Sequence, residues 1–145
     1  MITLSKFKLS DYEELVNMYY EFNKDVYPNR KIGERYFFYK AVMKWISQDI
    51  DIVISRDGDT MTGFSMCYKD MFGGLTEAIY QCDLCYVKPA YRKSRSAYML
   101  YNNAYEYAKE LGLKISASGR VENGVDKMIM KHFGLEKTFT TLEGE

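Results

Sequence analysis

The stretch that decides the fold runs from Asp83 to Gly112 and reads DLCYVKPAYRKSRSAYMLYNNAYEYAKELG. Its first residues read as a strand that ends at Pro89, which cannot continue a β-ladder. A basic, hydroxyl-rich turn follows, and then apolar residues recur at helical spacing until Gly112, a residue that commonly ends helices. The pattern therefore predicts a strand, a turn and a long helix at Ser94–Leu111, with the buried stripe Ala97, Leu100, Ala104, Tyr107, Ala108 and Leu111.

The turn before this helix concentrates cations and hydroxyls in the sequence Arg92, Lys93, Ser94, Arg95, Ser96. The first turn of a helix leaves four backbone N–H groups without partners, and the helix dipole adds about half a positive charge there. Cations at this end are unfavourable unless an anion binds, and a pyrophosphate uses more donors than one carboxylate does. The turn thus predicts an anion site. The alternative is a helix start whose charges are simply solvated.

The rest of the chain predicts a mixed α and β domain covering residues 1–145. The expected order is β-α-α-β-β-β-α-β-α-β, and the segment from Tyr80 to Ala117 should form a right-handed parallel β-α-β unit. The turn signal Arg56–Asp59 predicts a hairpin, and Ser10 with Glu13 predicts a capping box at the first helix. The other predicted elements are strands at Ile2–Leu9, Asp49–Ser55, Thr60–Asp70, Thr76–Val87, Leu113–Ser118 and Leu135–Leu142, and helices at Ser10–Phe22, Glu34–Ser47 and Asn123–Phe133.

Composition excludes several classes of function. Twenty basic and twenty acidic residues cancel, so a nucleic-acid partner is not expected. Cys67, Cys82 and Cys85 are read as free thiols in a reducing compartment, with Cys82 and Cys85 on opposite sides of one strand. A zinc site is not expected with a single histidine. No apolar run reaches the roughly 20 residues of a membrane span, and we expect a cytoplasmic protein.

Two segments resemble the GNAT superfamily of acyl-CoA-dependent N-acyltransferases. That family has the pattern Arg/Gln-x-x-Gly-x-Gly/Ala after a strand that ends in Val-x-Pro, and Val87, Pro89, Arg92, Arg95 and Ala97 take these positions. The later stretch SGRVENGVDKMIMKHFGLEK resembles the family's asparagine, short helix and closing Gly-Phe. The variant looks most similar to members encoded by bacteriophages.

The resemblance implies a GNAT fold, with acetyl-CoA as co-substrate and no metal. It implies that the pyrophosphate binds at the basic turn and that the pantetheine arm pairs with the strand before it. The implied CoA-binding residues are Cys85, Tyr86, Val87, Arg92, Lys93, Ser94, Arg95, Ser96, Ala97 and Asn123. Arg95 departs from the family, which usually has glycine there, so its side chain should hold the ligand farther off, turn away or reach the ribose phosphate.

The residues for acyl transfer are only partly suggested by the sequence. Asp83 is the candidate base, or a group that positions water, although a carboxylate paired with a neighbouring cation is the alternative. Met130 takes the place of the tyrosine that usually serves as the family's acid, so another tyrosine serves, or the thiolate leaves unaided, or activity is weak or lost. Tyr86 is better read as a core aromatic, His132 as a cation near a helix end, and Cys85 as an unactivated thiol.

The resemblance thus predicts an N-acetyltransferase that moves an acetyl group directly from acetyl-CoA to a primary amine. The acceptor, a small molecule or a protein amine, should bind between the first two helices and the loops of the β-meander. The alternative is a weak or inactive GNAT-fold protein that binds CoA or serves as a virion-associated structural or interaction module. A small RNA-binding domain is a third, weaker reading. The protein is expected to be a monomer or a homodimer.

Overall fold

The computed structural model describes residues 1–71, 78–117 and 125–135. The strands are β1 (Ile2–Lys6), β2 (Asp51–Asp57), β3 (Thr60–Met71), β4 (Ala78–Val87) and β5 (Lys114–Ala117). The helices are α1 (Tyr12–Val26), α2 (Arg35–Ser47), α3 (Ser96–Glu110) and α4 (Val125–Phe133), and short 3₁₀ turns lie at Leu9–Asp11 and Pro89–Tyr91.

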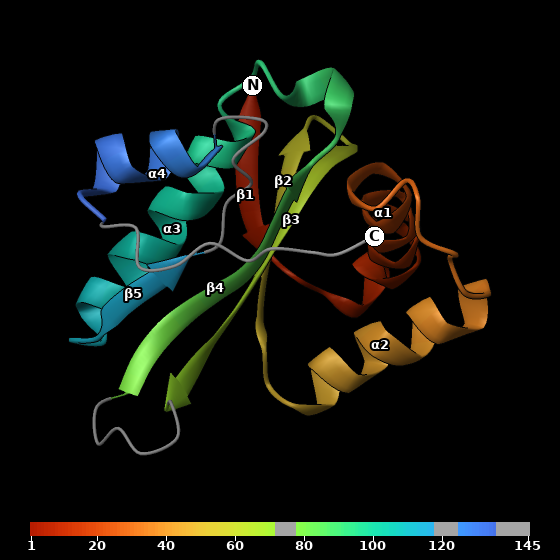
Figure 1. The fold of residues 1–145 in the computed structure, drawn as a ribbon, viewed down its shortest axis with the longest axis horizontal. Coiled ribbons are helices and arrows are strands. Elements are labelled where there is room, and N and C mark those ends of the chain that lie inside the picture. Colours follow the sequence, from red (N-terminus) through yellow and green to blue (C-terminus); the bar gives the residue numbers. More distant parts are fainter. Residues whose placement is uncertain (72–77, 118–124, 136–145) are drawn as a thin grey trace.

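The strands form one mixed sheet in the order β1-β2-β3-β4-β5. The first four are antiparallel neighbours, and β5 pairs with β4 in parallel, so α3 is the crossover of the predicted β-α-β unit. Figure 1 shows α1 and α2 on one face of the sheet and α3 and α4 on the other. The predicted mixed α/β fold class is confirmed, and so is the chain order through α4.

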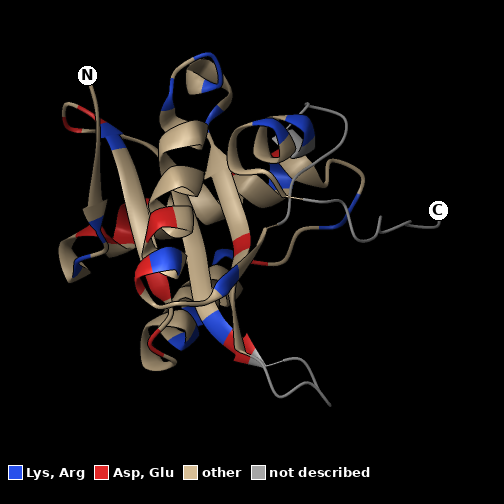
Figure 2. Ribbon diagram, turned by 90° about the vertical axis from the view of Figure 1, so that its left-hand side faces the viewer, with Lys and Arg blue, Asp and Glu red and all other residues tan. Residues whose placement is uncertain are grey.

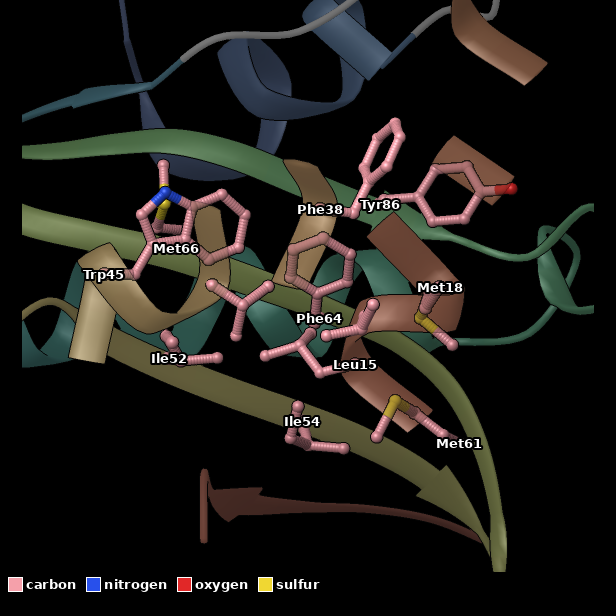
Figure 3. Packing of buried hydrophobic residues seen from close by; sticks show 12 residues of the cluster. Leu15, Met18, Phe38, Trp45, Ile52, Ile54, Met61, Phe64, Met66 and Tyr86 are labelled. Carbon is pink, nitrogen blue, oxygen red and sulfur yellow. The ribbon is translucent and has the colours of Figure 1, made fainter. Parts of the chain in front are cut away.

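A separate apolar core fills each face of the sheet. Figure 3 shows the core under α1 and α2, where Leu15, Val42, Ile54 and Phe64 have no exposed surface. Fully burying one such side chain stabilises the fold by about 1.5–3 kcal/mol. The core under α3 is built from smaller residues and aromatics: Cys67, Tyr80, Cys82, Tyr101, Ala104, Ala108, Ile129 and Phe133. Small residues on α3 let this helix lie close to the sheet.

Helix α1 begins differently from the prediction. The predicted capping box of Ser10 and Glu13 is wrong, because Ser10 lies inside the 3₁₀ turn that precedes the helix. Instead, the Lys8 backbone N–H donates to the Asp11 carboxylate at 2.9 Å. Asp11 is buried and pairs with Arg56 on β2 at 2.7 Å, so a tertiary contact selects the start of the helix.

Other boundaries shift by a few residues. Helix α3 begins at Ser96 rather than Ser94, and α1 continues to Val26 rather than Phe22. Most of the predicted strand Leu135–Leu142 lies outside the described residues. None of the helices in the part of the chain that the structure describes is long and apolar enough to cross a membrane.

Candidate acetyl-CoA and acceptor site

Strand β4 contains a bulge at Asp83. Cys67 of β3 pairs with Cys82, but the preceding residue, Met66, pairs with Leu84, so Asp83 is the extra residue. A bulge of this kind leaves one residue outside the ladder and reverses the alternation of side chains beyond it. Tyr80 and Cys82 therefore face α3, whereas Leu84 and Tyr86 face α1 and α2. Side chains therefore do not alternate strictly along β4, as the predicted placement of Cys82 and Cys85 required.

The bulge also changes the reading of the cysteines. Cys82 and Cys85 were expected on opposite sides of the strand, but both pack in the core under α3, together with Cys67. All three are free thiols. Burial raises the pKa of Cys85, and a hydrogen bond that the Cys82 thiol donates to Cys67, then burial, raises the pKa of Cys82. Cys82 and Cys85 are therefore poor nucleophiles at neutral pH, since the thiolate is the reactive form.

The edge of β4 that faces β5 is paired only over part of its length. The parallel pairing runs from Ile79 to Cys82, and no described strand continues it along Asp83–Val87. This is the segment in which Cys85, Tyr86 and Val87 were predicted to receive an extended ligand. The Val87 carbonyl accepts a hydrogen bond from Nε of Arg92 at 3.2 Å, which ties the strand end to the basic turn.

The basic turn is held by a chain of buried hydroxyls. The Ser96 hydroxyl has no exposed surface and lies 3.1 Å from the Thr62 hydroxyl, which lies 2.8 Å from that of Ser55. Ser94 donates to the Tyr91 carbonyl and accepts from the Ser96 backbone N–H at 3.2 Å. The hydroxyls of Ser94 and Ser96 therefore already have partners within the protein, and they fix the entry of α3 against the sheet.

Unbonded backbone donors surround this entry. Within the described ranges, the N–H groups of Lys93, Arg95, Ala97 and Tyr98 form no hydrogen bond. Figure 2 shows basic residues on the turn before α3, at the top of the view. Together these donors and charges suit an anion with several oxygens.

The three cations of the turn are disposed differently. Arg92 forms an ion pair with Asp25 of α1 and lies over the Tyr86 ring, with the guanidinium carbon 5.8 Å from the ring centre. Arg95 turns along the helix, and its guanidinium carbon lies 5.2 Å from the centre of the Tyr98 ring. Lys93 is exposed. The Arg95 side chain thus points away from the basic turn, which is one of the outcomes expected for a side chain at the family's glycine position.

Asp83 is exposed, at the bulge of β4. Its carboxylate lies near two phenols that sequence reasoning did not single out, Tyr19 on α1 and Tyr68 on β3. Burial, then Tyr27 and Asp83, raise the pKa of Tyr19, and a hydrogen bond from Asn23 partly offsets this. Burial, then Asp83 and Asp70, raise the pKa of Tyr68. Both phenols are therefore protonated donors at neutral pH.

The remaining predicted residues lie elsewhere or outside the described residues. Tyr86 is buried in the core under α1 and α2, and burial, then Asp25, raises its pKa to about 12. Met130 is half-buried on α4, and the His132 ring packs edge-on against Tyr98 at 5.3 Å. Asn123 lies outside the described residues. Among residues the structure describes, no three His, Cys, Asp or Glu side chains are grouped to hold a metal.

Comparisons with known proteins agree with this architecture. A probable acetyltransferase is 16% identical, with a TM-score of 0.77 and 99% of each chain covered. A GNAT family acetyltransferase of Staphylococcus aureus is 16% identical, with a TM-score of 0.72 and coverage of 99% of this chain and 98% of that one. The aminoglycoside N-acetyltransferase AAC(6')-Iy, in complex with the bisubstrate analogue CoA-S-monomethyl-acetylneamine, is 13% identical, with a TM-score of 0.73 and coverage of 100% and 97%.

At these identities the structures share the fold with this chain. No curated protein matches the sequence. The family assignment comes from the match of the acetyltransferase (GNAT) family to residues 12–128, which is most of the sequence. The segment includes α1, the bulged strand β4, the basic turn and α3. The chain therefore belongs to the acetyltransferase (GNAT) family.

Proposed function

We propose that the protein is an N-acetyltransferase that moves an acetyl group from acetyl-CoA directly to a primary amine. The observation that carries this proposal is the continuity between the open edge of β4 beyond Asp83 and the unbonded N–H groups where α3 begins. An extended chain along that edge would end with its anionic group at the basic turn. Such a ligand combines a linear arm with a diphosphate, as CoA does.

We assign the binding of CoA to two groups of residues. The backbone of Cys85, Tyr86 and Val87 would pair with the pantetheine arm as an added strand does. At the turn, the backbone N–H groups of Lys93, Arg95, Ala97 and Tyr98 would meet the pyrophosphate, with charge from Arg92 and Lys93. Ser94 and Ser96 would act by shaping the turn, because their hydroxyls are bonded internally. Asn123 is carried over from the resemblance alone.

Acetyl-CoA supplies an activated acyl group whose carbonyl carbon accepts the amine. We assign to Asp83 the proton that the acceptor ammonium loses before it attacks, directly or through a water. As the C–N bond forms and the C–S bond breaks, the leaving thiolate needs a proton. We assign this proton to Tyr19 or Tyr68, which are protonated phenols near Asp83 and would take the place of the acid that Met130 cannot supply.

The alternative is a protein that binds CoA without transferring the acetyl group. Two observations favour it: Met130 cannot donate a proton, and Arg95 stacks on Tyr98 where the family usually has a glycine. An enzyme and such a module differ in turnover, not in affinity for CoA.

Two measurements test the proposal. Titration with acetyl-CoA should give a micromolar dissociation constant, which corresponds to about −8 kcal/mol. Release of free thiol in the presence of an amine panel should then depend on both substrates. CoA binding without thiol release would leave the binding module as the function, and the absence of CoA binding would refute both.

Other parts of the proposal rest on the sequence and the family relationship. They are a single domain over residues 1–145, a small-molecule or protein amine as acceptor and a monomeric or homodimeric state. The AAC(6')-Iy complex supports a small-molecule amine, because its ligand contains acetylneamine. The likeness to bacteriophage-encoded members, and with it a location in the host cytoplasm, stays a prediction.

A further inference from the structure

The α1 side of β3 and β4 carries a row of polar groups beside the bulge. From Met66 to Asp70 strand β3 alternates regularly, so Tyr68 and Asp70 project from the same face as Met66, which packs in the core under α1 and α2. Tyr68 pairs with Gln81 on β4, which places the Gln81 side chain on that face too. We call Tyr19, Tyr68, Asp70, Gln81 and Asp83 the acceptor face.

Gln81 is the unusual member of the acceptor face. Its side chain is buried, with 9% of its surface exposed, yet it forms no hydrogen bond with any residue in the described ranges. A buried amide without partners costs about 1–3 kcal/mol, so such groups are normally satisfied by the protein, water or a ligand. Gln81 thus indicates that a polar ligand, or the water it displaces, belongs on this face.

The phenols complete the surroundings of that ligand. Tyr19 lies on α1, and two rings of α2 contact its ring edge-on. The distances between ring centres are 4.7 Å to Trp45 and 5.5 Å to Phe38. Burial has the largest effect on the pKa of Tyr68, and Asp83 and Asp70 raise it further, as expected for a phenol that lies between the two carboxylates. Aromatic rings beside carboxylates suit ammonium groups and the alkyl chain that joins them.

The carboxylates of the acceptor face differ from other carboxylates of the protein in their partners. Asp11 and Asp25 pair with arginines, and Asp51 accepts from the Tyr80 hydroxyl at 2.7 Å. Asp70 and Asp83 form no ion pair with a described residue. Asp70 pairs with Ile79 across the sheet, and Ile79 lies four residues before Asp83 on β4. About four residue steps and one strand spacing therefore separate the two aspartates, or roughly 13 Å between their Cα atoms.

We propose that the acceptor face binds an amine with two positive charges, its reacting ammonium at Asp83 and its second ammonium at Asp70. This inference rests on the proposed function, because it names the acceptor class of that same site. Each ammonium offers three N–H donors. The carboxylates of Asp83 and Asp70 and the side-chain amide oxygen of Gln81 can accept hydrogen bonds from them. A monoamine would leave Asp70 and Gln81 without a partner, so the face selects diamines and larger polyamines.

The test measures amine binding to the full chain in the presence of CoA, by calorimetry. The probes are α,ω-diamines from 1,3-diaminopropane to 1,8-diaminooctane, each compared with the monoamine of equal chain length. We expect the best diamine to bind at least tenfold more tightly than its monoamine. Asp70→Asn should bring this ratio close to one, whereas Asp59→Asn, which removes the same charge from the exposed β2–β3 turn, should leave it unchanged.

Three results would overturn the inference: equal binding of diamines and monoamines, an unchanged ratio in Asp70→Asn, or no binding of any amine. If Asp70→Asn does not fold, the salt dependence of the wild-type protein decides instead. Diamine affinity should then fall more steeply with salt than monoamine affinity, and parallel slopes would contradict the second charge contact.

These binding measurements do not require acetyl transfer, so the two proposals fail separately. Diamine binding that depends on Asp70, without any acetylated product, supports the acceptor face and refutes the enzymatic function. Acetylation of monoamines alone, with no preference for diamines, supports the enzymatic function and refutes the acceptor face.

Discussion

The guanidinium of Arg92, in the turn before α3, is ion-paired with the carboxylate of Asp25, in the last turn of α1. The same guanidinium donates from Nε to the Val87 carbonyl and lies over the Tyr86 ring. One side chain thus joins the end of β4, the proposed phosphate site and the helix beside the proposed acceptor face. Two of its five N–H donors bond to residues that the structure describes, and the other three form no hydrogen bond with any of these residues.

Arg92→Glu should weaken the binding of CoA by more than tenfold, because a negative charge replaces a cation next to the phosphates. The Arg92 and Asp25 side chains are 41% and 33% exposed, so losing their ion pair should lower the free energy of unfolding by only about 1 kcal/mol. Calorimetric titration with CoA and urea denaturation measure the two effects.

Asp25→Asn is the matched control for this change. It removes the same ion pair but keeps the cation, so stability should fall by a similar amount while the affinity for CoA stays within about threefold. If Asp25→Asn weakened CoA binding as much as Arg92→Glu does, CoA binding would depend on the ion pair rather than on the charge of Arg92.

Ser96→Ala should lower the free energy of unfolding by about 1–3 kcal/mol, since it removes a partner from the buried Thr62 hydroxyl and leaves a polar group less well satisfied. Ser47→Ala is the control, because that hydroxyl is exposed and, among the described residues, bonds only the Lys44 carbonyl on the last turn of α2. Its effect should stay within about 0.5 kcal/mol. Equal effects of the two changes in urea denaturation would argue against a structural role for the hydroxyl chain.

Gly63→Ala should destabilise the protein by about 1–3 kcal/mol through overpacking between β3 and β4. A Cβ atom at Gly63 would lie 2.4 Å from the Tyr86 carbonyl oxygen, and this backbone atom cannot move aside without shifting β4. At Gly33 the nearest atom is on the Phe37 ring at 3.2 Å, which is exposed and can rotate. Gly33→Ala should therefore have little effect, and thermal unfolding of both variants tests the contrast.

The stability of the protein should fall as pH rises from about 10 to about 12, in part because of Tyr86. Burial, followed by the nearby Asp25, raises the pKa of Tyr86 from the ordinary value of 10 to about 12. Between these values the unfolded chain releases the phenol proton and the folded chain retains it, so rising pH favours unfolding.

Tyr86→Phe should make this loss of stability with pH shallower. Tyr36→Phe, which changes a ring that is 61% exposed, should leave the slope as it is in the wild-type protein. Urea midpoints measured from pH 9 to 12 give the three slopes, and identical slopes for wild type and Tyr86→Phe would show that Tyr86 does not contribute.

The sequence alone determined the fold class and the order of elements from β1 to α4, because these follow from local patterns. Helical spacing, turn residues and the change from strand to helix around Pro89 and Gly112 are read within a few neighbouring residues. The turn from Arg92 to Ser96 was also visible, since cations before a helix conflict with its dipole unless an anion binds.

Only the tertiary structure decided how side chains are distributed around Asp83. A bulge depends on the register between two strands, and no periodicity in β4 alone reveals that residues beyond Asp83 have changed faces. The same holds for Tyr19, Tyr68 and Gln81, which come together from α1, β3 and β4. Pairing and packing between distant segments set these positions, so the chemistry of the acceptor face follows from the assembled sheet rather than from any single stretch of the chain.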